Sequence, residues 1–334
     1  MSDITSTISE PPSPSAIKMP TERVTIIGAG WLGSALAFHF LKKGFDVIAT
    51  KQTDAGIVDL QARIEDAQDA LIVSDKKSIL QQLQLVTFTE IDLLNDGSKE
   101  KLKTLFADRS IIITIPPTPF IQRTEKILPE NEASLRYEKM ITQIAQMASQ
   151  YGAREVLYTS STSVYGDSSG TIHEATPPMP KTLSAKAIRS AESALEVIAI
   201  ERHLPITILR LGGLIGNGRH PVYVLSGREN ISKPFDAINL IHINDLLLAI
   251  DALLLRTTKT EIPTFSIYNV VTPYHPNRQS YYQAIAKHLQ LPIPQFESPT
   301  PILKRIIDGS KITEAGDFTY REIDLISAPL DKIL

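Results

Sequence analysis

Short apolar runs alternate with longer amphipathic segments along most of the chain. The apolar runs are rich in Val, Ile and Leu and predict β-strands at residues 24–27, 46–50, 86–91, 110–115, 155–159 and 206–209. The segments between them predict helices at residues 31–43, 60–72, 99–106, 133–151 and 183–202. Near-continuous apolar strands that each lead into a helix are typical of a parallel sheet with both faces covered. The pattern therefore predicts an α/β fold of the Rossmann type, with a doubly wound parallel sheet.

The first predicted strand runs into a glycine-rich turn that opens a helix. The turn reads GAGWLG at residues 28–33, and a second strand follows by residue 46, as in a βαβ unit. In such turns the first glycine permits the bend, the second lets backbone N–H groups approach a pyrophosphate, and the third lets helix and strand pack closely. A purely structural turn is the alternative. We interpret it as a dinucleotide-binding motif made by Gly28, Gly30, Trp31, Leu32 and Gly33.

The end of the second strand bears on the choice between NADP and NAD. An acidic residue at this point would bind the ribose hydroxyls of NAD, but the strand ends in Thr50 and Lys51. Lys51 together with the Thr50 hydroxyl would attract a 2′-phosphate, which a carboxylate would repel. We therefore favour NADP over NAD as the cofactor. Asp54, three residues later, is an acidic residue that could still bind the ribose of NAD, so NAD remains an alternative. If Lys51 is only a solvated surface residue, it favours neither cofactor.

The alternation of strands and helices loosens after residue 211. Residues 1–21 are rich in Ser and Pro, show no apolar period and predict a disordered tail. Residues 22–211 would form the NAD(P)-binding Rossmann domain, to which residues 239–270 return. Residues 212–238 and 271–334 would form a smaller C-terminal lobe that binds substrate. Within these later segments, helices are predicted at residues 244–255 and 278–289.

Composition narrows the classes of function. The chain of 334 residues has 34 Lys and Arg, 37 Asp and Glu and a net charge of −3, which argues against nucleic acid or an anionic membrane as its main partner. It contains no cysteine, and its seven histidines lack metal-binding spacing, so we expect no metal site. It shows neither a signal-peptide pattern nor a membrane-spanning apolar run. We expect a cytoplasmic protein that binds a small molecule.

Later segments follow one another in an order that is typical of one protein family. The strand at residues 155–159 continues through the residues SSTS at 160–163 into the sequence VYG at residues 164–166. The segments LRLGGLIG, LIHIND and IYNV then follow at residues 209–216, 240–245 and 267–270. In this order of motifs, over about residues 23–325, the chain resembles the extended short-chain dehydrogenase/reductases.

A narrower resemblance is to the bacterial YeeZ-like proteins, which are atypical extended members described as NAD-dependent epimerase/dehydratase-like. It rests on the glycine turn and on the stretches at residues 159–166, 218–221 and 273–278. The resemblance implies a bound NAD(P) but supplies no reaction. Extended members often dimerise through two helices that correspond here to residues 133–151 and 183–202, and both a monomer and a homodimer stay open.

The resemblance also implies catalytic positions, and the usual pair is missing from them. In the wider family a Tyr, with a Lys four residues later on the same helix face, moves the proton. Here those positions hold Ser184 and Ile188. Ser161 corresponds to the serine that, in the family, hydrogen-bonds the reacting substrate oxygen. The alternative is that its hydroxyl forms a hydrogen bond with the backbone at the end of the strand. Tyr165 is the phenol expected nearest the nicotinamide, or it is a packed aromatic residue.

The remaining candidates follow from their places along the chain. Pro116 and Ser160, at the ends of the fourth and fifth strands, are expected to contact the cofactor. Arg219 and His220, in a glycine-rich loop, and Arg278, in the lobe motif, suit an anionic substrate group. A solvent-exposed loop is the alternative.

Two functions remain open at this point. One is an NAD(P)-dependent oxidoreductase or epimerase-like enzyme acting on a small polar substrate such as a nucleotide sugar. The other is a dinucleotide-binding sensor or scaffold that has lost catalysis, which the missing Tyr and Lys would explain.

Overall fold

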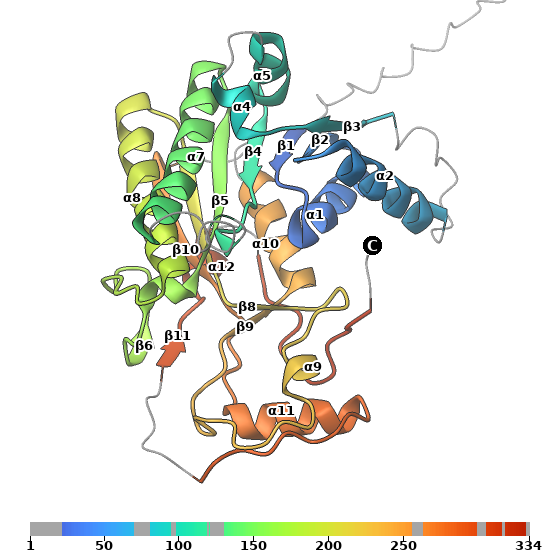
Figure 1. The fold of residues 1–334 in the computed structure, drawn as a ribbon, viewed down its shortest axis with the longest axis vertical. Helices are drawn as coiled ribbons and strands as arrows, with labels where there is room; N and C mark the ends of the chain where they lie inside the picture. Colours follow the sequence, from blue (N-terminus) through green and yellow to red (C-terminus); the bar gives the residue numbers. More distant parts are fainter. Residues whose placement is uncertain are drawn as a thin grey trace, which may run out of the picture.

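A seven-stranded sheet forms the centre of the molecule in the computed structural model (Figure 1). The structure describes residues 22–69, 81–94, 98–118, 120, 130–255, 263–298, 305–315 and 318–331. The predicted disordered tail at residues 1–21 lies outside the described residues.

All seven strands run parallel, in the order β10-β7-β5-β4-β1-β2-β3. Their bounds are β1 Arg23–Ile27, β2 Asp46–Lys51, β3 Leu83–Thr87, β4 Ser110–Ile113, β5 Glu155–Ser161, β7 Ile206–Leu211 and β10 Phe265–Val270. The chain proceeds from β1 outward to β3 and then crosses back to β4 on the other side of β1. In open parallel sheets, ligands bind outside the carboxyl ends of the strands at such a point of reversal.

Helices cover both faces of this sheet and bury its near-continuous apolar strands. Their bounds are α1 Trp31–Lys42, α2 Asp54–Asp69, α4 Glu90–Leu94, α5 Lys99–Phe106, α7 Glu130–Gln150, α8 Leu183–Arg202, α10 Ile243–Leu255 and α12 Lys311–Ala315. One core cluster lies under α1 and α10, and a second lies under α5, α7 and α8. The two clusters occupy opposite faces of the sheet, which confirms the predicted doubly wound architecture.

A third apolar cluster belongs to elements that lie beyond the carboxyl ends of the strands. Figure 1 shows these elements at the bottom of the view. The cluster packs α11 (Arg278–His288) against α9 (Val222–Leu225) and the parallel pair β8 (Gly213–Ile215) and β9 (Leu240–His242). We call this part the small lobe. A second short pair, β6 (Gly170–Ile172) with β11 (Arg305–Ile307), lies beside it. The division of the chain into domains stays a prediction.

Two predicted boundaries are wrong. The third strand occupies Leu83–Thr87 rather than residues 86–91, and α2 begins at Asp54 rather than at residue 60. Both segments lie at the sheet edge, where β3 is only half-buried and the first turn of α2 is exposed. Since little apolar surface is buried there, the hydrophobic pattern that locates element ends is weak.

None of the described helices is both long and apolar enough to cross a bilayer. The predicted cytoplasmic location stays a prediction.

Candidate functional site

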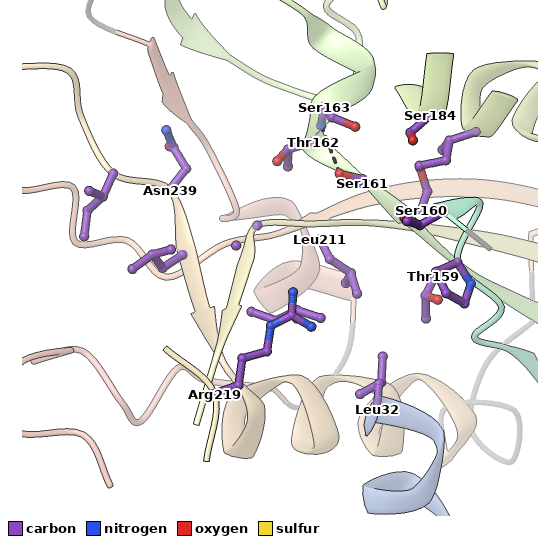
Figure 2. Close-up of a pocket in the computed structure, with 18 of the residues that line it drawn as sticks. Leu32, Thr159, Ser160, Ser161, Thr162, Ser163, Ser184, Leu211, Arg219 and Asn239 are labelled. Atoms are coloured by element: carbon purple, nitrogen blue, oxygen red, sulfur yellow. Dashed lines mark hydrogen bonds between the residues drawn. The ribbon is translucent and has the colours of Figure 1, made fainter. Parts of the chain in front are cut away.

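A cavity of about 750 Å³ opens where the carboxyl ends of the sheet strands face the small lobe. Its lining combines the glycine turn, the ends of β4 and β5, the start of α8, the β8–β9 pair and α11. Figure 2 shows serines of the β5 end and of α8 on one side of this cavity, with Arg219 and Asn239 on other sides. The cavity therefore lies at the ligand crevice that the sheet topology indicates.

The glycine turn has the geometry that a bound pyrophosphate requires. Gly28 has φ +99°, a conformation that L side chains rarely adopt. A Cβ at Gly33 would lie 2.6 Å from the carbonyl oxygen of Gly28, so only glycine lets α1 pack this close. At Gly30 the nearest heavy atom to an added Cβ is 4.0 Å away, and this residue lines the cavity. Space for a ligand therefore exists at the middle glycine.

The start of α1 leaves its backbone donors free for that ligand. The helix has Gly30 at its N-cap with no side-chain capping hydrogen bond, and its first turn contains no acidic residue. The first N–H groups of a helix have no partner within the helix, and they carry its positive dipole end. A dinucleotide phosphate fits this position.

Thr50 supports the glycine turn instead of pointing to a ligand. Its buried hydroxyl accepts a hydrogen bond of 3.0 Å from the Gly28 N–H, and its carbonyl accepts one of 2.8 Å from the Ala29 N–H. Lys51, the next residue, is half-buried against the backbone of Gly56. Burial and the nearby Arg63 lower the pKa of Lys51. The cavity described above does not include either Thr50 or Lys51 in its lining.

The end of β5 presents two serines to the cavity in different ways. Ser160 donates a hydrogen bond of 2.5 Å to the carboxylate of Glu192, which is fully buried on α8. Ser161 accepts a hydrogen bond of 3.1 Å from the Ser163 N–H and thereby caps the short 3₁₀ helix that follows. Because this bond uses a lone pair, the Ser161 hydroxyl proton is free to donate into the cavity.

Tyr165, weighed above as a phenol near the nicotinamide or as a packed aromatic residue, does not reach the cavity. It is fully buried and does not line the cavity. Its hydroxyl donates to the Asn269 side chain at 2.8 Å and accepts from Arg210 at 2.9 Å. Burial raises its pKa, although Arg210 and Asn269 act in the opposite direction. The geometry therefore favours the alternative of a packed aromatic residue that holds Arg210.

Arg210 and Glu192 form a buried ion pair beneath the cavity floor. Two guanidinium nitrogens of Arg210 donate to the Glu192 carboxylate at 3.0 and 2.8 Å, and both side chains are at most 2% exposed. Burial alone would lower the pKa of Arg210, but the hydrogen bonds and charge of Glu192 raise it. The pair joins Ser160 on β5 to Tyr165 through one continuous polar network.

The start of α8 brings the two expected catalytic positions to the cavity wall. Ser184 and Ile188 both line the cavity, one turn apart on the same helix face. Thr182 caps the helix by accepting a hydrogen bond of 3.2 Å from the Ala185 N–H. A hydroxyl and an apolar side chain therefore stand at the positions that, by the resemblance, a phenol and an amine would occupy.

The small lobe and the neighbouring β11 line the cavity with cations, of which two were missed from the sequence. Arg219 and Arg278 were expected, and Lys233 and Arg305 join them. Arg305 donates hydrogen bonds to the carbonyl oxygens of Gly166 and Thr162. Neither Lys233, in the loop after α9, nor Arg305, on β11, belongs to a recognisable motif, so only the folded structure brings them to the cavity.

His220 does not reach the cavity and is another correction. It is 4% exposed, its Nε2 shares a hydrogen bond of 2.9 Å with the Tyr281 hydroxyl, and its Nδ1 accepts from the Val222 N–H at 3.0 Å. Burial, together with the nearby His242, lowers its pKa to about 4. His220 therefore stabilises the core of the small lobe as a neutral ring.

The other predicted cofactor-binding residues lie at the cavity wall. Trp31, Leu32 and Pro116 line the cavity beside the glycine turn, as does Ser160. Among the described residues, no group of three or more His, Asp or Glu side chains could hold a metal ion.

Comparison with known proteins agrees with this architecture. A model of the NAD dependent epimerase/dehydratase family matches residues 24–226. Protein YeeZ of Escherichia coli strain K12 is 32% identical over 314 residues, which cover 93% of this chain and 100% of YeeZ. The predicted resemblance to the YeeZ-like proteins is therefore confirmed.

Solved structures with the same fold are more distant in sequence. MoeE5 in complex with UDP-glucose and NAD is 16% identical, with a TM-score of 0.68 over 93% of this chain and 97% of that one. UDP-glucuronic acid 4-epimerase from Bacillus cereus, in complex with NAD, is 19% identical, with a TM-score of 0.66 over 93% and 96% of the two chains. The fold and the matches in sequence lead to one conclusion: the chain belongs to the NAD dependent epimerase/dehydratase family.

Proposed function

We propose that the protein is an NAD(P)-dependent oxidoreductase or epimerase-like enzyme acting on a small, polar, anionic substrate such as a nucleotide sugar. One observation carries the proposal: a single cavity joins the glycine turn, the free hydroxyl proton of Ser161 and the cations of the small lobe. MoeE5 and the Bacillus cereus epimerase were solved with a sugar nucleotide and with NAD, which supports this class of substrate.

The chain's own groups divide the work within the cavity. The first N–H groups of α1 would hold the dinucleotide phosphates, since the helix start is uncapped. A bound nicotinamide would accept a hydride from a substrate carbon or return it. Ser161 would donate a hydrogen bond to the substrate oxygen at that carbon, held in place by the Ser163 N–H.

The small lobe supplies the charge that an anionic substrate needs. Arg278 lies at the start of α11 and donates to the carbonyl oxygen of Ser232 at 2.9 Å, which fixes its direction. Lys233 directly follows Ser232 in the chain and also lines the cavity. Charge-assisted hydrogen bonds from Arg278 and Lys233 would hold a phosphate or carboxylate of the substrate.

Lys51 favours NADP as the cofactor in this proposal. It ends β2, where a dinucleotide ribose lies in Rossmann domains. Its desolvated ammonium lies near Arg63, so two cations act on this position, opposed by Asp59. This positive charge would stabilise the 2′-phosphate of bound NADP, whereas NAD has no phosphate at that position.

A second candidate function is supported by α8. Among the described residues that line the cavity, Lys233 carries the only amine and Tyr282 the only phenol, and both residues belong to the small lobe. Ser184 and Ile188 cannot lower the pKa of a phenol or move its proton. This favours a dinucleotide-binding sensor or scaffold without catalysis as the alternative.

Two measurements on the full chain test the proposal. NADPH and NADH are first titrated by fluorescence, and hydride exchange with UDP-sugars is then followed at the nicotinamide absorbance. An enzyme should lose at least roughly 100-fold in rate on Ser161→Ala, with NADPH affinity unchanged. Ser163→Ala is the matched control, because Ser163 lines the cavity but contacts Ser161 only through its backbone N–H.

Each outcome selects one conclusion. Binding without turnover of any UDP-sugar would favour the sensor or scaffold. Equal rates for Ser161→Ala and the native chain would remove Ser161 from the chemistry. Failure to bind either dinucleotide would contradict both candidate functions.

A further inference from the structure

We propose that Arg219 belongs to the dinucleotide site, where its guanidinium binds the diphosphate of NAD(P), and not to the substrate subsite. The inference rests on the dinucleotide binding proposed above. It assigns to the small lobe a direct part in holding the cofactor.

Arg219 contacts the glycine turn through Trp31. Trp31 directly follows Gly30 and begins α1. The Arg219 guanidinium lies over the Trp31 ring, 5.3 Å from its centroid, in a cation–π arrangement. The Trp31 indole N–H also donates a hydrogen bond of 3.0 Å to the carbonyl oxygen of Asn217. Two contacts thus join the Arg219 loop to the residue that follows the middle glycine.

The backbone of the Arg219 loop is held by hydrogen bonds within the protein. Gly216 and Arg219 exchange two backbone hydrogen bonds, of 2.9 and 3.0 Å, around Asn217 and Gly218. Asn217 and Gly218 have φ +48° and +72°, as in a tight type I′ turn, where Asn-Gly is the preferred pair. The Gly218 N–H donates to the carbonyl oxygen of Leu330 at 2.8 Å. The backbone of Arg219 is therefore already fixed, which reduces the entropy cost of binding.

The guanidinium of Arg219 is free to bind an anion. Arg219 is exposed, and its guanidinium forms no hydrogen bond or ion pair with any residue that the structure describes. By contrast, Arg278 and Arg305 of the same cavity each donate to backbone carbonyl oxygens. A planar guanidinium with all its donors free matches two phosphate oxygens at once.

The glycine turn has no cationic side chain of its own. Residues 28–33 contain no Lys or Arg, so the turn offers a diphosphate only backbone N–H groups and the helix dipole. Arg219 lines the same cavity as Gly30, Trp31 and Leu32 and would supply the missing cation. In Figure 2 it lies on the same side as Leu32 and away from Ser184 and Ser163.

Trp31 makes the test direct, because it is the only tryptophan of the chain. Its fluorescence is followed while ADP-ribose, NADH and NADPH are added to the full-length protein. ADP-ribose contains the diphosphate but lacks the nicotinamide, so its binding reports the phosphate site without any chemistry. Arg219→Met should weaken all three ligands by roughly 10- to 100-fold, the loss expected for one charge-assisted contact.

Three further variants separate this result from other causes. Arg219→Lys keeps the charge but not the paired donors and should give an intermediate loss. Lys51→Met should weaken NADPH but leave ADP-ribose and NADH unchanged. Arg228→Met removes a cation from an exposed site on the small lobe outside the cavity and should change none of the three affinities.

The outcomes distinguish this inference from the proposed function. Native affinity of Arg219→Met and Arg219→Lys for ADP-ribose would overturn the inference. Loss of NADPH alone in Arg219→Met would instead move Arg219 to the 2′-phosphate and would also overturn it. If the native protein bound none of the three ligands, the proposed function itself would fail.

Discussion

Glu192 is the centre of the polar network beneath the cavity, and Glu192→Gln should destabilise the fold strongly. Both carboxylate oxygens are occupied: they accept from Ser160 at 2.5 Å, from two nitrogens of Arg210 at 3.0 and 2.8 Å, and from Arg189 at 3.2 Å. Gln has nearly the same shape, but it is neutral and replaces one acceptor by an NH₂ donor. That donor would face the N–H groups of a guanidinium.

The size of the effect follows from burial. The Arg210 side chain is 2% exposed and would lose its counter-ion, and breaking a buried pair in this way costs about 3–5 kcal/mol. A whole domain is stable by about 5–15 kcal/mol, so a large share of the free energy of unfolding would be lost. Arg189 binds the same carboxylate but is 31% exposed, so Arg189→Met should cost no more than about 1 kcal/mol.

Urea unfolding at pH 7, followed by far-UV circular dichroism, measures both variants against the native chain. The double variant Glu192→Leu with Arg210→Met removes both charges and should recover part of the loss, since a buried pair stabilises little against an apolar pair. The reasoning would be refuted if Glu192→Gln cost as little as Arg189→Met. It would equally be refuted if the double variant lost the sum of its single substitutions.

Three other changes test the glycine turn, the end of β2 and the core of the small lobe. Gly33→Ala would place a methyl group 2.6 Å from the Gly28 carbonyl oxygen, so we expect a loss of about 1–3 kcal/mol in urea unfolding and weaker binding of NADPH; native affinity would contradict this role of Gly33. Lys51→Asp should raise the dissociation constant of NADPH relative to that of NADH, and an unchanged ratio of the two would show that Lys51 does not select the cofactor. His220 has a folded pKa of about 4, below its unfolded value, so its contribution is complete above about pH 6.5 and is lost as the pH falls toward 4. Between pH 7 and pH 5, the free energy of unfolding should therefore fall by about 2 kcal/mol more in the native chain than in His220→Gln. Equal pH dependence of the two proteins would contradict this.

Much of the fold was predictable because its causes are local. The helices at Lys99–Phe106 and Leu183–Arg202 match their predicted bounds. Their apolar positions recur at helical spacing, and one face of each helix is buried. The glycine turn was also predictable, since positive φ and close packing leave glycine as the residue that fits.

The candidate site was predictable only in part. Ser161, Pro116, Arg219 and Arg278 line the cavity, and contact of each with a cofactor or substrate stays a prediction. Tyr165 and His220 belong to the same motifs, yet both are buried and point into hydrogen-bond networks. A motif specifies which residues are present, but the direction of a side chain depends on the partners that surround it.

Periodic burial and backbone chemistry, which depend on neighbours along the chain, were enough to establish the parallel sheet and the place of its phosphate-binding turn. Contacts between residues far apart in the chain required the folded structure. Trp31 and Asn217 are 186 positions apart and form a hydrogen bond, and Lys233 and Arg305 reach the cavity from a loop of the small lobe and from β11. Such pairings are selected by packing and charge in three dimensions, so no spacing in the sequence reveals them.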